Sequence, residues 1–198
     1  MVYGFGAPHL PLYKIAVVEP RNFNWRDIKV VDTERDEGLS PNLGRDLFCG
    51  RPVHTEHFPK VIRYTDKKPI PDWAQHQCMH MVSPAFKAIV EAIEPGIHQF
   101  IPVRYIGTHK VHLADMWFMV VCNRIDSIDR THSTMRFDNY WRDYPLGRIV
   151  FNNAQIGTAH MWRDKFIMPA STFMSDEMGN ALISANLTGF VYGKPESV

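Results

Sequence analysis

The residues best suited to chemistry in this chain are histidines, cysteines and aspartates at short spacings. His76, Cys78 and His80 alternate, which would place three metal-binding side chains on one face of a strand. Zinc needs three or four converging ligands, usually in spacings such as CxxC or HExxH, and neither spacing occurs here. The pattern allows a zinc site but favours histidines that lie at the surface or make local hydrogen bonds.

Asp126 and Asp129 belong to the densest cluster of polar groups, NRIDSIDRTHS (123–133). Paired carboxylates can act as acid and base or hold a metal. The alternative is a turn that leaves a buried strand, in which Asp and Asn side chains hydrogen-bond the nearby backbone. Ile125 and Ile128 alternate with the polar residues and need burial, so the turn is favoured.

Other catalytic signatures are missing from the sequence. It contains no GxSxG elbow, no GxGxxG and no GxxxxGK[ST] loop, and none of its cysteines lies in a recognised catalytic pattern. The enzymatic alternative is therefore a metal-dependent hydrolase that uses the histidines and aspartates. We expect instead a protein that is not an enzyme and has no cofactor.

The elements that would position these residues are clearest between residues 82 and 122. Ser83 predicts a helix N-cap, Pro84 suits the first helical position, and Pro95-Gly96 ends the helix. Two apolar stretches, Gln99–Ile106 and Asp115–Cys122, predict strands. The helix has one apolar stripe, formed by Phe86, Ile89, Val90 and Ile93.

The remaining pattern is sparser. Tyr13–Val18 and Trp25–Val31 are strand candidates, and Asp72–Met81 is a helix candidate. Ser175 predicts the cap of a last helix, with Asp176 and Glu177 in its first turn. Further strands are expected at 148–151, 165–168 and 187–192, with a turn at 155–157.

This order predicts an α+β fold, a mixed or antiparallel sheet with a few packed helices. We expect an irregular N-terminal region with short strands over residues 1–80 and an α+β core over 81–198, which could form one continuous domain.

Composition limits the partners. The formal net charge of +1 and the lack of a long basic run argue against direct nucleic-acid binding. Three widely spaced cysteines form no disulfide framework, and no apolar run is long enough to cross a membrane. The N-terminus lacks the features of a signal peptide, so a cytoplasmic protein is expected.

Four stretches stand out, in order, in the last part of the chain: VSPAFKAIVEAIEPGIHQFIPVRY (82–105), VVCNRIDSIDRTHS (120–133), AHMWRDKFIM (159–168) and ISANLTGFVY (183–192). They resemble a family of bacterial immunity proteins defined around a myxobacterial immunity protein. Members of that family are encoded beside polymorphic or type VI secreted toxins. Together the stretches span roughly the last 115 residues.

The resemblance implies an antitoxin that binds a cognate toxin and occludes its active site. A cytoplasmic location makes a nuclease the first expectation and an NAD-degrading or ADP-ribosylating enzyme the second. Aromatic and charged residues suit an interface, so we expect contacts from Tyr140, Trp141, Arg142 and Asp143. The alternative is that Tyr140 and Trp141 fold back on the core. Glu34 and Asp36, in a predicted exposed loop, form a second candidate surface.

Overall fold

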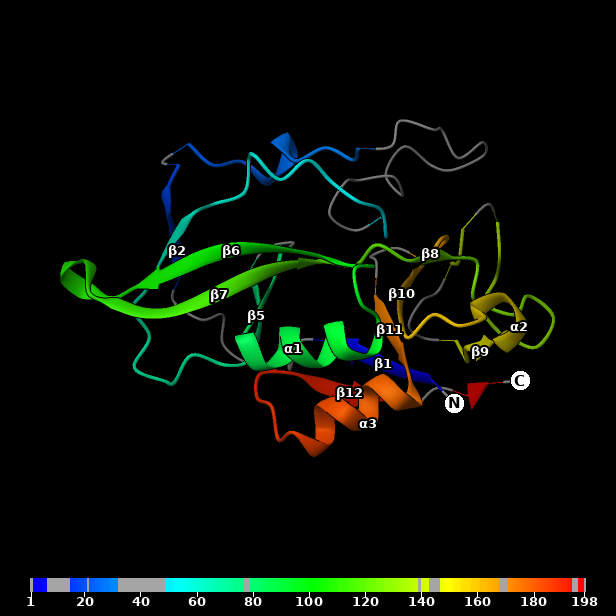
Figure 1. Ribbon diagram of the computed structural model, residues 1–198. Helices are drawn as coiled ribbons and strands as arrows, with labels where there is room; N and C mark the ends of the chain where they lie inside the picture. Colours follow the sequence, from blue (N-terminus) through cyan, green and yellow to red (C-terminus); the bar gives the residue numbers. More distant parts are fainter. Residues whose placement is uncertain are drawn as a thin grey trace.

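The computed structural model describes residues 2–6, 15–20, 22–31, 49–76, 79–138, 140–142, 147–167, 171–193 and 196–197. These residues build two main β-sheets, with two helices packed beneath them (Figure 1). The predicted α+β class is confirmed.

The larger sheet has six strands in the order β2-β3-β6-β7-β5-β4. β3 and β6 are parallel neighbours, and the other pairs are antiparallel, so the sheet is mixed. The bounds are β2 Ile15–Glu19, β3 Val61–Tyr64, β4 Trp73–His76, β5 Met79–Val82, β6 Gln99–Ile106 and β7 His112–Val120.

The smaller sheet has five strands in the order β12-β1-β11-β10-β8. Strands from the first 80 residues thus pair with later strands in both sheets, through β1–β11 and β3–β6. A domain boundary near residue 80 stays a prediction. The bounds are β1 Val2–Gly6, β8 Arg124–Ile125, β10 Met161–Asp164, β11 Thr172–Ser175 and β12 Val191–Gly193; β9 Val150–Phe151 pairs separately with β13 Glu196–Ser197.

The two longer helices begin as the sequence predicts. In α1 (Pro84–Ile93), the Ser83 hydroxyl accepts a hydrogen bond from the Phe86 N–H at 3.2 Å. In α3 (Asp176–Ser184), Ser175 caps the helix in the same way. Each hydroxyl satisfies one backbone N–H that has no partner inside its helix. Both predicted caps are confirmed.

The buried apolar side chains form three clusters. One covers the inner face of the six-stranded sheet, under segments 22–31 and 49–60. A second lies between α1, α3 and both sheets, and a third lies around α2 (Asn153–Ile156) and β10. On the predicted stripe of α1, Phe86 and Val90 are fully buried, whereas Ile89 and Ile93 are only partly buried.

Several predicted elements are wrong. Segment 25–31 is not a strand: it begins with a 3-10 turn (η1, Trp25–Asp27), because Asn24 caps it. Segment 72–81 is not helical but contributes β4 and β5, since pairing with β7 determines its structure.

The strand predicted at 165–168 lies at Met161–Asp164 instead, where Arg163 and Asp164 are both buried. A hydropathy pattern does not recognise this strand, because two of its buried residues are charged. The predicted turn at 155–157 contains the end of the short helix α2.

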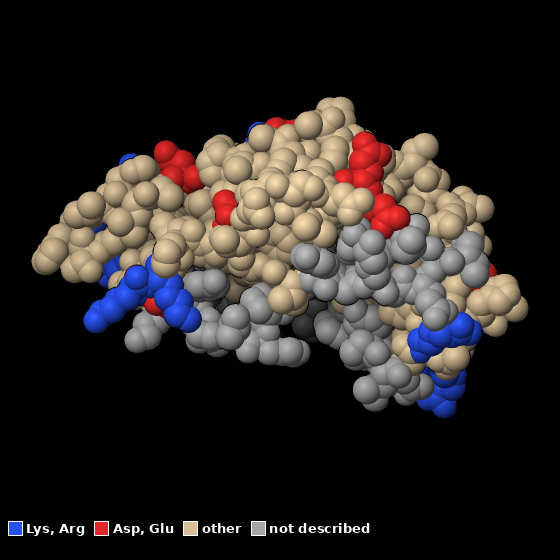
Figure 2. All heavy atoms as spheres, turned by 90° about the horizontal axis from the view of Figure 1, so that it is seen from below, with Lys and Arg blue, Asp and Glu red and all other residues tan. Residues whose placement is uncertain are grey.

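The face that carries α1 and α3 is mostly uncharged (Figure 2). Acidic side chains are scattered over it, and the lysines and arginines visible in this view gather toward its two ends. No helix among the described residues is both long enough and apolar enough to cross a membrane.

Candidate functional site

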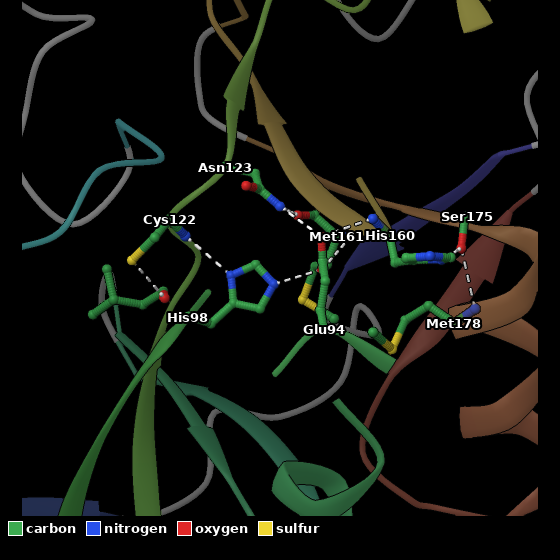
Figure 3. A network of polar contacts seen from close by, with 9 residues as sticks. Glu94, His98, Cys122, Asn123, His160, Met161, Ser175 and Met178 are labelled. Atoms are coloured by element: carbon green, nitrogen blue, oxygen red, sulfur yellow. Dashed lines mark hydrogen bonds and ion pairs between the residues drawn. The ribbon is translucent and has the colours of Figure 1, made fainter. Parts of the chain in front are cut away.

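A buried carboxylate joins the two sheets at the end of α1. Glu94 is the C-cap residue of this helix, and its side chain turns inward to the start of β10 (Figure 3). Pro95 follows, and a residue before proline is disfavoured in the helical conformation, so the helix ends here. Only 8% of Glu94 is exposed.

Each of the two oxygens of this carboxylate accepts two hydrogen bonds. Oε1 accepts from Asn123 Nδ2 at 2.7 Å and from the His160 backbone N–H at 2.9 Å. Oε2 accepts from His98 Nε2 and from the Met161 backbone N–H, each at 2.9 Å. The donors come from the loop before β6, the segment after β7 and the start of β10, so one side chain connects three parts of the fold (Figure 3).

The hydrogen bonds set the tautomer of His98. Its Nδ1 accepts from the Cys122 backbone N–H at 3.1 Å. The ring proton therefore lies on Nε2, which donates to Glu94. Burial alone raises the pKa of Glu94, but the hydrogen bonds from His98, the His160 backbone and Asn123 outweigh it and lower the pKa below its usual value.

Glu94 and His98 resemble a catalytic carboxylate–histidine pair, but the Glu94 carboxylate makes its hydrogen bonds within the protein. A carboxylate offers about four lone-pair sites, and all of those on Glu94 are taken. The group therefore stabilises the junction and has no site left to accept a proton from a substrate. The only local signal for this group in the sequence is a Glu and a His four residues apart around Pro95-Gly96.

An open groove of about 380 Å³ lies beside the junction. His160 borders it, and its Nδ1 lies 2.9 Å from the Ser175 hydroxyl that caps α3. The lining mixes apolar and polar side chains, and Ile97 is 44% exposed. The lining residues are Ile93, Glu94, Pro95, Ile97, Asn123, Ile156, Thr158, Ala159 and His160.

The two predicted aspartates form a turn and do not face each other as a pair. Asp129 Oδ1 accepts from the backbone N–H groups of Thr131 (2.7 Å) and His132 (2.8 Å), which lowers its pKa. Asp126 pairs with Arg130 at 2.7 Å. The favoured alternative, a polar turn after a buried strand, is confirmed.

A third aspartate, not singled out in the sequence, lies beneath this turn. Asp164 Oδ2 accepts from the Ser127 N–H and hydroxyl at 2.9 and 2.8 Å, and Oδ1 accepts from the Phe166 N–H at 2.8 Å. Burial, the largest influence, raises its pKa to about 6. Asp164 holds the NRIDSID turn against the end of β10.

The histidines do not converge on a metal site among the described residues. No group of three His, Cys, Asp or Glu side chains in that part of the chain could hold an ion. His80 Nε2 is occupied by Arg163 Nη2 at 2.6 Å, and burial together with this arginine keeps the His80 pKa well below its usual value. Cys78 and the side chain of His76 lie outside the described residues.

Comparison with known proteins identifies a family whose model matches this chain. The model of the Immunity protein family (Imm11) matches residues 18–197. The chain belongs to this family. No curated protein matches it.

In this immunity-family chain, the predicted contact residues divide between core and surface. Trp141 is only 2% exposed and packs edge-on against Phe137, with ring centroids 5.0 Å apart. The alternative that Trp141 folds back on the core is therefore the one observed. Tyr140 and Arg142 are partly exposed, and the Arg142 guanidinium lies 4.1 Å from the Tyr140 ring centroid. Asp143, Glu34 and Asp36 lie outside the described residues.

Proposed function

We propose that this chain is an immunity protein that binds one cognate toxin in a stoichiometric complex and occludes its active site. The observation that carries the proposal is the family match over residues 18–197. The most catalyst-like group, Glu94 with His98, supports it because all its hydrogen-bonding capacity serves the fold. Binding, not turnover, is then the function.

The toxin in this proposal is a nuclease or, as the second choice, an NAD-degrading or ADP-ribosylating enzyme. It is delivered between competing bacteria by type VI secretion or a related polymorphic-toxin system. The immunity protein acts in the cytoplasm, where such a toxin finds its target, and protects the producing cell and its kin. It binds neither nucleic acid nor membrane directly.

Two sets of contact residues belong to this proposal. The first is Tyr140, Arg142 and Asp143, of which the described pair offers an aromatic ring and a guanidinium at the surface. The second is the acidic pair Glu34 and Asp36. Neither set includes Trp141, whose ring is buried.

Co-expression with the toxin encoded beside this gene tests the proposal. Cells that make the toxin alone should stop growing, and cells that make both proteins should grow normally. The purified pair should elute from gel filtration as one complex, with a mass from light scattering equal to one chain of each. A toxin that still kills, and that elutes separately from this chain, would overturn the proposal.

A further inference from the structure

The hairpin of β6 and β7 projects from the body of the protein (Figure 1). β5 pairs with β7 only at Trp117–Met119. Among the described residues, the outer edge of β7 from His112 to Met116 therefore has no strand partner. An open edge with free N–H and C=O groups is a surface on which another chain can dock.

One face of this hairpin is only half covered. Side chains alternate between the faces of a strand, so Leu113, Asp115, Trp117 and Met119 share the face toward α1. Trp117 and Met119 pack in the cluster beneath α1, whereas Leu113 and Asp115 are exposed. The covered part of the face stabilises the fold, and the part nearer the tip remains open to solvent.

The tip exposes apolar side chains on a well-defined turn. Val111 is 59% exposed and Leu113 44%. The Gly107 N–H donates to the Val111 carbonyl at 2.7 Å, and His109 and Lys110 have φ of 57° and 62°. Left-handed backbone is unfavourable for such residues and tends to occur where function requires it.

Positive charge surrounds these apolar residues. Lys110 at the tip, Arg104 on β6 and Arg63 on the adjoining strand β3 are all exposed. The nearby acid, Asp115, lies directly opposite Arg104 in the hairpin register and 3.1 Å from His112, so it offsets part of this positive charge. We call Arg63, Arg104, Lys110, Val111 and Leu113 the hairpin surface.

We propose that the toxin also binds through the hairpin surface, in addition to the two sets of contact residues named above, and that it offers this surface an acidic patch around an apolar pocket. This inference rests on the proposed function. Val111 and Leu113 would fill the pocket, since buried apolar anchors at the centre of an interface supply most of its affinity. The three cations would meet toxin carboxylates and speed association.

Two hairpin variants and one matched control test this assignment. Val111→Ser/Leu113→Ser removes the apolar anchors, and Arg104→Glu/Lys110→Glu reverses two charges. Val191→Ser is the control, because Val191 is also a half-exposed valine (50%) but lies on β12 of the other sheet. Surface substitutions away from core, cap and buried polar groups leave stability nearly unchanged, so all three proteins should melt like the wild type.

Surface plasmon resonance with catalytically inactive toxin gives the expected pattern. The apolar variant should bind at least about tenfold more weakly through faster dissociation. The charge variant should associate more slowly at low salt and lose its dependence on ionic strength. Val191→Ser should bind like the wild type.

The outcomes separate this inference from the proposed function. If the wild type and both hairpin variants bind equally well, the proposed function stands and the hairpin assignment is wrong. If the wild type does not bind, the proposed function fails and the assignment fails with it. If the wild type is a dimer that the apolar variant dissociates, with toxin binding unchanged, the surface belongs to a second copy and the assignment is overturned.

Discussion

The Glu94 junction and the hairpin surface differ in the burial and hydrogen bonding of their polar groups. At the junction, a carboxylate with 8% exposure accepts four hydrogen bonds from three parts of the fold. On the hairpin, a strand edge, two arginines and a lysine face solvent without a covering element among the described residues. The carboxylate at the junction has no hydrogen-bonding site left, whereas the strand edge and the cations of the hairpin can still bind a partner.

In a chain with no catalytic motif, this difference separates groups that hold the fold together from groups that can bind a partner. Buried polar groups with every bond satisfied hold the structure in one arrangement, and losing one partner leaves the others unsatisfied. Exposed groups on a projecting element cost little to change and can serve a partner. Mutations should therefore divide into two classes, those that lower stability and those that lower toxin binding alone.

Glu94→Ala should have the largest effect on stability. It leaves His98, Asn123 and two backbone N–H groups without their acceptor, which should lower the free energy of unfolding by about 3–5 kcal/mol. Urea denaturation measures this. Glu91→Ala is the control, because Glu91 makes a partly exposed pair with Lys87 on the same helix; it should cost less than about 1 kcal/mol. Equal losses in the two variants would contradict a structural role for the junction.

Trp141→Ala should have a comparable effect. The ring is 2% exposed and packs in the third apolar cluster, so its removal should cost about 3–5 kcal/mol. Protection in cells should fall because less folded protein is present, and any folded fraction should bind toxin with an unchanged dissociation rate. A variant with wild-type stability and faster toxin release would place Trp141 in the interface instead.

Phe86→Ala and Ile93→Ala test the stripe of α1 against each other. Phe86 is fully buried, and its truncation should cost about 3–5 kcal/mol. Ile93 is only partly buried and borders the open groove, so its truncation should cost less than about 2 kcal/mol. Thermal melting of both variants gives the order. The reverse order would mean that the facing of α1 is wrong.

Asp164 should produce a stability signal that depends on pH. Its pKa is about 6 in the folded protein against an ordinary 3.8, so between these values the folded state binds a proton that the unfolded state has lost. The contribution of Asp164 to stability therefore falls as pH rises across this window. Asp164→Asn should remove that component from the pH profile of unfolding, and Asp138→Asn, at an exposed site, should keep it. An unchanged profile in Asp164→Asn would contradict the raised pKa.

Local sequence signals predicted the parts of the fold that local physics determines. The caps Ser83 and Ser175 and the strand Gln99–Ile106 are observed as expected, because hydroxyl caps and apolar strands depend on neighbouring residues. The predictions for segment 72–81 and for β10 were wrong. The structure of both depends on pairing with distant strands, and β10 also buries Arg163 and Asp164.

The site was harder to predict than the fold for the same reason. Glu94 meets His160 and Met161 across more than sixty residues, and no spacing rule links them. The turn at Asp126 and Asp129 could be predicted because its hydrogen bonds are local. The hairpin surface could not be predicted from the sequence. Lys110, Val111 and Leu113 form a common surface only because the paired strands β6 and β7 project together.

Isothermal titration of the purified chain with the inactive form of its neighbouring toxin is the sharpest test of toxin binding. One binding site per chain and a Kd well below about 1 μM are expected, because an immunity protein must remain bound at cellular concentrations. Titration of the Val111→Ser/Leu113→Ser variant alongside should give the same stoichiometry with a weaker Kd. No heat of binding, and no complex at concentrations of about 10 μM, would contradict the claim that this chain works by binding a toxin.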